Sequence, residues 1–168
     1  MLSLVLIAGC DLSTSPAPSR AAAEPAVAQL NSDGSAELLI DVETGHGLIR
    51  DAASEISPGL QIASFDSPPS VVRFAGGHRL VATGLQPDGN CFTVSLELPR
   101  AQGGLLGPLS SKDGGASSFG GDTCNGVGCT GCRLENDPEN GNYCDCWRSA
   151  APNGYCNHNT GGGPGGNT

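Results

Sequence analysis

The stretch 90-NCFTVSLELP-99 decides the fold, because apolar and polar side chains alternate along it. Successive side chains of a strand point to opposite faces of a sheet, so every second residue shares one environment. Proline has no N–H group to donate to a neighbouring strand, and Pro99 therefore ends the pattern. The stretch predicts a β-strand with one face in the core. That face carries Phe92, Val94, Leu96 and Leu98, and the other face carries Cys91, Thr93, Ser95 and Glu97.

Shorter stretches on the N-terminal side predict partners for this strand. The turn formers of 86-QPDGN-90 join it to 79-RLVATGL-85, and Gly76-Gly77 turns that stretch back onto 70-SVVRF-74. Alternation in 35-SAELLIDV-42 predicts a further strand. The buried face of that strand is expected to carry Ala36, Leu38, Ile40 and Val42.

One segment has helical rather than strand periodicity. The apolar residues of 48-LIRDAASEI-56 recur every three or four positions, and Ser57-Pro58-Gly59 follows as a stop signal. This pattern predicts one helix of about ten residues. Together the patterns predict that residues 31–101 form a small antiparallel β domain, either a sheet or a sandwich, with one short helix.

The composition limits the functions open to the chain. The chain contains eight Lys and Arg and 17 Asp and Glu, which gives it a net charge of −9. This balance argues against a nucleic-acid partner, because phosphate binding needs clustered basic side chains. No nucleophile-elbow, zinc-protease or phosphate-loop motif occurs, and His46 and His78 stand alone beside glycines. We interpret both histidines as solvated loop residues and predict no catalytic residue, no cofactor and no enzymatic activity.

Most of the cysteines lie in the final third of the chain. They are Cys124, Cys129, Cys132, Cys144, Cys146 and Cys156. The stretch 134-LENDPENGNYCDCW-147 predicts a hairpin, because Asn140-Gly141 favours a type I′ turn. Cys144 and Cys146 then share one face of the second arm, about 7 Å apart, which is too far for a bridge between them. We expect each of them to bond to a different, distant cysteine.

Two kinds of chemistry fit these six cysteines. A segment with so few large apolar residues cannot be stabilised by apolar burial alone. Disulfides among all six cysteines would supply covalent cross-links that stabilise its fold. This prediction leaves the fifteen possible pairings open and leaves Cys91 as the free thiol, unless Cys91 joins the module to the β domain and leaves another thiol free. The alternative is four thiolates on one zinc ion, from Cys129, Cys132, Cys144 and Cys146, in a spacing that resembles a zinc-ribbon knuckle.

Composition also suggests the boundaries between the parts of the chain. Residues 10–30 are rich in Ser, Pro and Ala and predict a flexible tether. Residues 102–122 predict a Gly/Ser-rich linker to a Cys-rich module at 123–158. Residues 159–168 predict a disordered, Gly-rich tail. Because the linker is flexible, the module is expected to fold independently of the β domain.

The chain opens on an apolar run that ends in Ile7-Ala8-Gly9-Cys10. This order resembles the lipobox of bacterial lipoproteins, and residues 1–9 then resemble part of a signal peptide. The resemblance implies cleavage before Cys10 and a lipid on its sulfur. Such a lipid anchors a protein to a membrane through its buried CH₂ groups.

The sequence therefore predicts a lipid-anchored protein of the bacterial cell envelope that faces outside the cytoplasm. Its expected role is binding, structural or surface display, and its expected partner is the membrane. Disulfides suit this location, because thiols oxidise outside the cytoplasm. The alternative is an envelope redox or zinc-binding protein that acts through the C-terminal cysteines.

Overall fold

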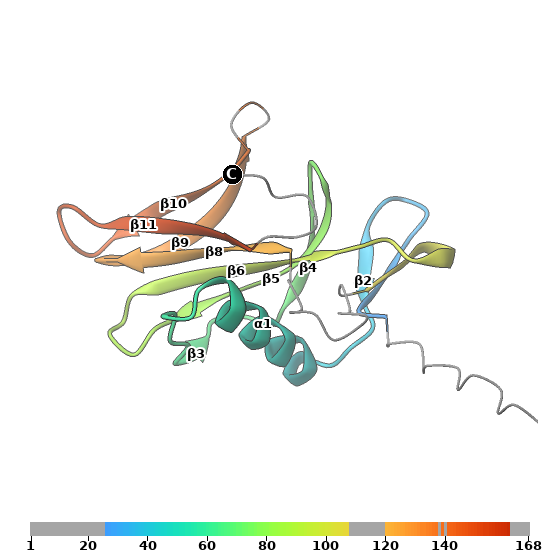
Figure 1. The fold of residues 1–168 in the computed structure, drawn as a ribbon, viewed down its shortest axis with the longest axis horizontal. Coiled ribbons are helices and arrows are strands. Elements are labelled where there is room, and N and C mark those ends of the chain that lie inside the picture. The colour runs from blue at the N-terminus through green and yellow to red at the C-terminus, as the bar shows by residue number, and fades with distance from the viewer. Residues whose placement is uncertain (1–25, 108–119, 138, 140, 162–168) are drawn as a thin grey trace, which may run out of the picture.

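Antiparallel strands and one α-helix build the part of the chain that the computed structural model describes, residues 26–107, 120–137, 139 and 141–161 (Figure 1). The mainly β fold predicted from the sequence is confirmed. No helix of these residues is long and apolar enough to cross a membrane. The elements are β1 (Ala28–Leu30), β2 (Ala36–Leu38), α1 (Val42–Ile56), β3 (Ser64–Phe65), β4 (Ser70–Phe74), β5 (Gly77–Leu85), β6 (Cys91–Leu98), a short 3-10 helix (Gln102–Gly104), β7 (Leu105–Leu106), β8 (Gly121–Val127), β9 (Cys129–Asp137), β10 (Gly141–Ser149) and β11 (Tyr155–Gly161).

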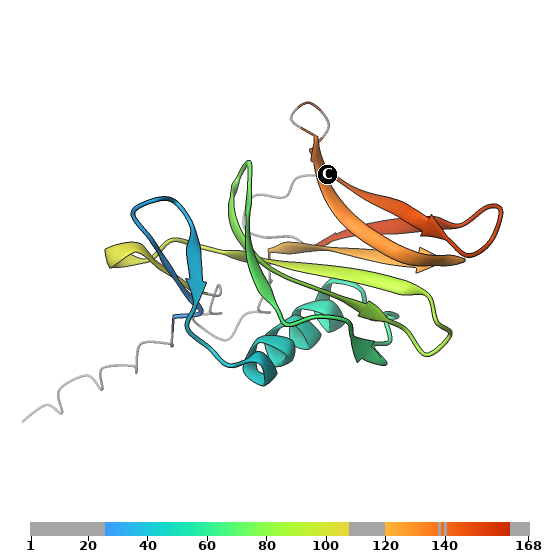
Figure 2. The ribbon, with the colours of Figure 1, turned by 180° about the vertical axis from the view of Figure 1, so that it is seen from behind.

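The largest sheet has six strands, in the order β11-β8-β6-β5-β3, with β4 also paired to β5. Figures 1 and 2 show α1 against one face of this sheet and the β9–β10 hairpin against the other. Strands β2, β1 and β7 form a separate three-stranded sheet. The architecture is therefore a sheet covered on both faces.

Strand β6 lies in the middle of the large sheet and has both of its faces buried. Phe92 and Val94 pack against Ile49 and the other core residues of α1, as the alternation predicts. The opposite face is also buried from Cys91 to Ser95, because the hairpin covers it and the Thr93 hydroxyl donates to the carbonyl oxygen of Cys132 at 2.9 Å. The expectation of a single buried face is wrong, since the covering hairpin comes from much later in the chain.

The helix is longer than predicted at its N-terminus. Asp41 caps it, and its carboxylate accepts a hydrogen bond from the Thr44 backbone N–H at 2.8 Å. An aspartate in this position satisfies an amide that the first turn leaves unpaired. Val42 consequently begins the helix and is exposed, and the strand predicted over 35–42 is reduced to β2.

Strands also occupy parts of the predicted tether, linker and tail. β1 lies within the predicted tether 10–30 and is part of the core, and it pairs with β7, which lies within the predicted linker 102–122. β11 extends to Gly161, inside the predicted tail. Two- and three-residue strands contain too few side chains for a periodic signal. The short 3-10 helix and the start of β8 also lie within the predicted linker. Residues 1–25, 108–119 and 162–168, which include the predicted signal peptide 1–9 and Cys10, lie outside the described residues.

The C-terminal cysteines do not form a unit separate from the β domain. β8 pairs with β6 from Phe92↔Asn125 to Leu96↔Gly121, and β11 pairs with β8 along its full length. The predicted hairpin is present as β9 and β10, although its turn residues 138 and 140 lie outside the described part. One sheet thus carries both the predicted domain and part of the predicted module.

A cysteine cluster as the candidate functional site

Two disulfides hold the hairpin against the large sheet, and a third lies within the hairpin. Cys91–Cys132 joins β6 to β9, Cys124–Cys144 joins β8 to β10, and Cys129–Cys146 lies within the hairpin. Their Cα–Cα separations of 5.6, 5.5 and 6.0 Å are in the usual range for a disulfide. As predicted from their common face, Cys144 and Cys146 bond to two different partners.

The remaining pairing differs from the sequence prediction. Cys91 is bonded to Cys132 and is not free, and Cys156 is the free thiol among the described cysteines. The structure instead shows the alternative in which Cys91 joins the module to the β domain and another thiol is left free. In the structure the hairpin packs on the second face of β6, which brings β9 to Cys91.

The free thiol of Cys156 lies against two of these disulfides. Its Sγ is 3.1 Å from Cys132 Sγ and 3.8 Å from Cys129 Sγ, and those two sulfurs are 3.9 Å apart. With Cys91, the four sulfurs lie within 4.8 Å of one another. We call Cys91, Cys129, Cys132 and Cys156 the cysteine cluster. Only two of them, Cys129 and Cys132, belong to the zinc set predicted from spacing.

A glycine makes this close approach possible. Gly126 on β8 is paired with Cys156 on β11, and a Cβ atom built on it would lie 2.8 Å from the sulfurs of both Cys91 and Cys132. Any side chain at this position would push the sulfurs apart. Burial, and then the negative charge of Asp145, raise the pKa of the Cys156 thiol, so the protonated form is favoured at neutral pH.

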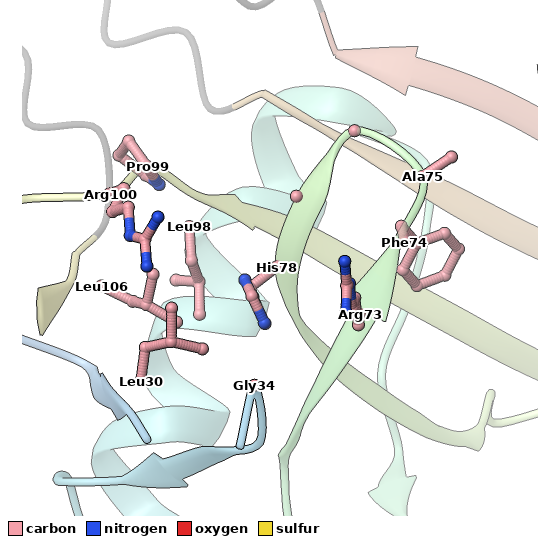
Figure 3. Close-up of a pocket in the computed structure, with 12 residues that line it drawn as sticks. Leu30, Gly34, Arg73, Phe74, Ala75, His78, Leu98, Pro99, Arg100 and Leu106 are labelled. Atoms are coloured by element: carbon pink, nitrogen blue, oxygen red, sulfur yellow. The ribbon is translucent and has the colours of Figure 1, made fainter. Parts of the chain in front are cut away.

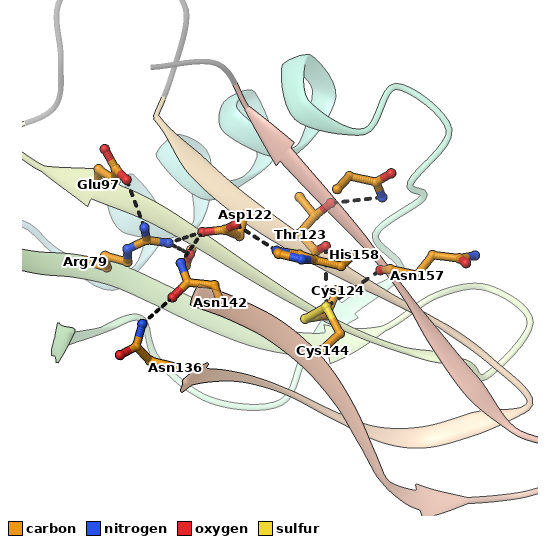
Figure 4. A network of polar contacts seen from close by, with 12 residues as sticks. Arg79, Glu97, Asp122, Thr123, Cys124, Asn136, Asn142, Cys144, Asn157 and His158 are labelled. Carbon is orange, nitrogen blue, oxygen red and sulfur yellow. Dashed lines mark hydrogen bonds and ion pairs between the residues drawn. A yellow bond between two sulfur atoms is a disulfide. The ribbon is translucent and has the colours of Figure 1, made fainter. Parts of the chain in front are cut away.

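A network of charged side chains positions the strand that carries Cys156 (Figure 4). Buried Asp122 pairs with Arg79, accepts from Asn142 at 2.9 Å and lies 2.8 Å from His158 Nε2. Arg79 also pairs with Glu97 at 2.8 Å. Because these five residues come from β5, β6, β8, β10 and β11, the network fixes the strands around the cluster. No sequence motif links them.

A pocket of about 560 Å³ lies at the other end of the large sheet (Figure 3). Leu30, Phe74, Leu98 and Leu106 are among its apolar lining residues, and Arg73, His78 and Arg100 are its basic ones. Within the described chain neither Arg73 nor Arg100 has an ion pair with a carboxylate. Two such guanidinium groups beside an apolar wall can hold a small anion with an apolar part.

The two histidines are not the solvated loop residues that the sequence predicted. His46 lies in α1, stacks on Phe65 with ring centroids 3.8 Å apart, and has its Nε2 3.1 Å from the carbonyl oxygen of Ser67. His78 is the second residue of β5, beside the pocket, and its buried Nε2 has no hydrogen-bond partner among the described residues. Strand pairing and helix packing decide both environments.

Comparison with protein-family models, with curated proteins and with solved structures finds no match to the chain.

Proposed function

We propose that the chain is a lipid-anchored protein of the bacterial cell envelope. Its β domain, cross-linked by disulfides, lies outside the cytoplasm and binds a ligand there. The observation that carries the proposal is the set of three disulfides, one of which, Cys91–Cys132, is deeply buried. Disulfides of this kind form in oxidising compartments and are rare in the cytosol. The order Ile7-Ala8-Gly9-Cys10 supports the lipid anchor, since it resembles the lipobox.

We expect Cys10 to carry the lipid, so a chain expressed from its own gene in its native host should incorporate a clickable fatty acid. Cys10→Ala should abolish incorporation and release the chain from the membrane fraction. Cys156→Ala is the matched control, because it also removes a thiol but leaves the lipobox intact. Labelling and membrane fractionation of a Cys10→Ala chain at the level of the unchanged protein would contradict the anchor.

The pocket of Figure 3 supports the binding role and suggests the charge of the ligand. The net charge of −9 repels anions from the protein as a whole. Arg73 and Arg100 are nevertheless not neutralised by carboxylates within the described chain, so they provide a local positive site. We propose that the ligand bears a carboxylate or a phosphate next to an apolar group.

Inorganic phosphate is expected to raise the thermal unfolding midpoint in a saturable way. A ligand at ten times its Kd stabilises the folded state by about 1.4 kcal/mol. The double variant Arg73→Gln/Arg100→Gln should lose this shift, whereas Arg50→Gln should keep it, because Arg50 lies over Phe65 and does not line the pocket. Scanning calorimetry at constant ionic strength measures the shift. An equal shift in the double variant would show a general salt effect.

A second candidate function is metal binding by the cysteine cluster. Four sulfurs within 4.8 Å of one another suit a tetrahedral thiolate site for zinc. Such a site requires reduction of Cys91–Cys132 and Cys129–Cys146, because a metal binds thiolates and not disulfides. This candidate uses Cys91 and Cys156 in place of the predicted Cys144 and Cys146.

A further inference from the structure

We propose that the cysteine cluster is a site of thiol–disulfide exchange, in which Cys156 attacks the Cys91–Cys132 disulfide and the chain alternates between two oxidised isomers. One isomer holds Cys91–Cys132 with Cys156 as the free thiol. The other holds Cys132–Cys156 with Cys91 as the free thiol. The inference rests on the oxidised state that the proposed function requires, but not on the lipid at Cys10.

The geometry selects the sulfur that is attacked. Cys156 Sγ lies 3.1 Å from Cys132 Sγ and 3.8 Å from Cys129 Sγ, so Cys132 is the nearer electrophile. No backbone shift is needed to bring the two sulfurs into contact. Gly126 contributes by leaving open the space beside both sulfurs of the Cys91–Cys132 bond.

The exchange needs no oxidant and no reductant. Cys156 loses its proton to solvent, and its thiolate attacks Cys132 Sγ. The Cys132–Cys156 bond forms as the Cys91–Cys132 bond breaks, and the electron pair of the broken bond leaves on Cys91. The Cys91 thiolate then takes up one proton, so each isomer contains three disulfides and one thiol among the described cysteines.

The exchange changes both the accessibility of the thiol and the strands that are tied together. Cys156 is partly exposed, whereas Cys91 is only 3 % exposed. A thiol transferred to Cys91 is therefore hidden from reagents and partner proteins. At the same time the bridge from β6 to β9 is replaced by one from β11 to β9. The hairpin then loses its covalent link to the central strand.

The test uses the full chain with single cysteine substitutions, acid quenching and peptide mapping without reduction. In Cys91→Ala, Cys132 loses its partner and is expected to bond to Cys156 in more than nine molecules of ten. Cys144→Ala is the matched control, because it also leaves one cysteine without its disulfide partner. That cysteine, Cys124, is not a member of the cluster. That variant should retain Cys124 as a free thiol, together with the one cluster thiol that is shared between Cys156 and Cys91.

The unchanged protein supplies an independent measurement if a variant fails to fold. After incubation at pH 8 its map should contain both the Cys91–Cys132 and the Cys132–Cys156 peptides, and Cys156→Ala should give the first alone. A single isomer in the unchanged protein, or free Cys132 and Cys156 thiols in folded Cys91→Ala, would overturn the exchange. So would one bound zinc with the four cluster cysteines as thiols, which would support the metal site. The fatty-acid labelling of Cys10, which tests the proposed lipid anchor, is independent of all these results.

Discussion

Phe92→Ala is expected to lower the free energy of unfolding by about 3–5 kcal/mol, because it leaves a large cavity in the core. The Phe92 ring is 0 % exposed, and it meets the edge of Phe65 with centroids 5.7 Å apart. The ring also lies against Gly84, where a Cβ atom would come within 2.7 Å of it. The structure around such a deletion relaxes only partly, so part of the space stays empty.

Urea denaturation followed by circular dichroism, with the disulfides intact, measures this loss. Val72→Ala on β4 is the control, because Val72 is 40 % exposed and its truncation should cost less than about 1 kcal/mol. Val71, and not Val72, is the residue of β4 that packs on the core. A Phe92→Ala protein as stable as Val72→Ala would mean that this face of β6 is not the core.

Removal of the Cys124–Cys144 bridge is expected to destabilise the whole chain by about 3 kcal/mol, the chain-entropy value for a loop of this length. The bridge spans 20 residues and ties β8 of the large sheet to β10 of the hairpin. The double variant Cys124→Ala/Cys144→Ala removes it without leaving a new thiol. Because β8 is paired with β6, removal of this bridge is expected to lower the stability of the large sheet as well as that of the hairpin.

Two probes distinguish a single cooperative unit from an independent module. Trp147 is on β10, 53 % exposed, with the Arg148 guanidinium over its ring, so its fluorescence follows the hairpin. Circular dichroism follows the strands as a whole. We expect both signals to change at one denaturant concentration, in the bridged protein and in the double variant. Loss of the Trp147 signal well before the circular dichroism would support a separate module.

Local physical chemistry was sufficient for several features of the chain. Alternation identified β6, turn residues placed β4, β5 and β6 in succession, and the stop signal after Ile56 ended the helix where the structure ends it. The shared face of Cys144 and Cys146 also showed that they need separate partners. Each of these inferences depends on residues within about ten positions of one another, whose relative geometry the backbone alone determines.

Only the tertiary structure decided which surfaces and sulfurs meet. The Cys91–Cys132 pair is separated by 41 residues, and it forms because the hairpin covers the second face of β6. The same packing leaves Cys156 as the described free thiol beside two disulfides. Asp122 likewise pairs or hydrogen-bonds with Arg79, Asn142 and His158, which lie on strands far apart in the sequence. Contacts across such separations depend on how whole strands pair and pack, and no short stretch of sequence carries that information.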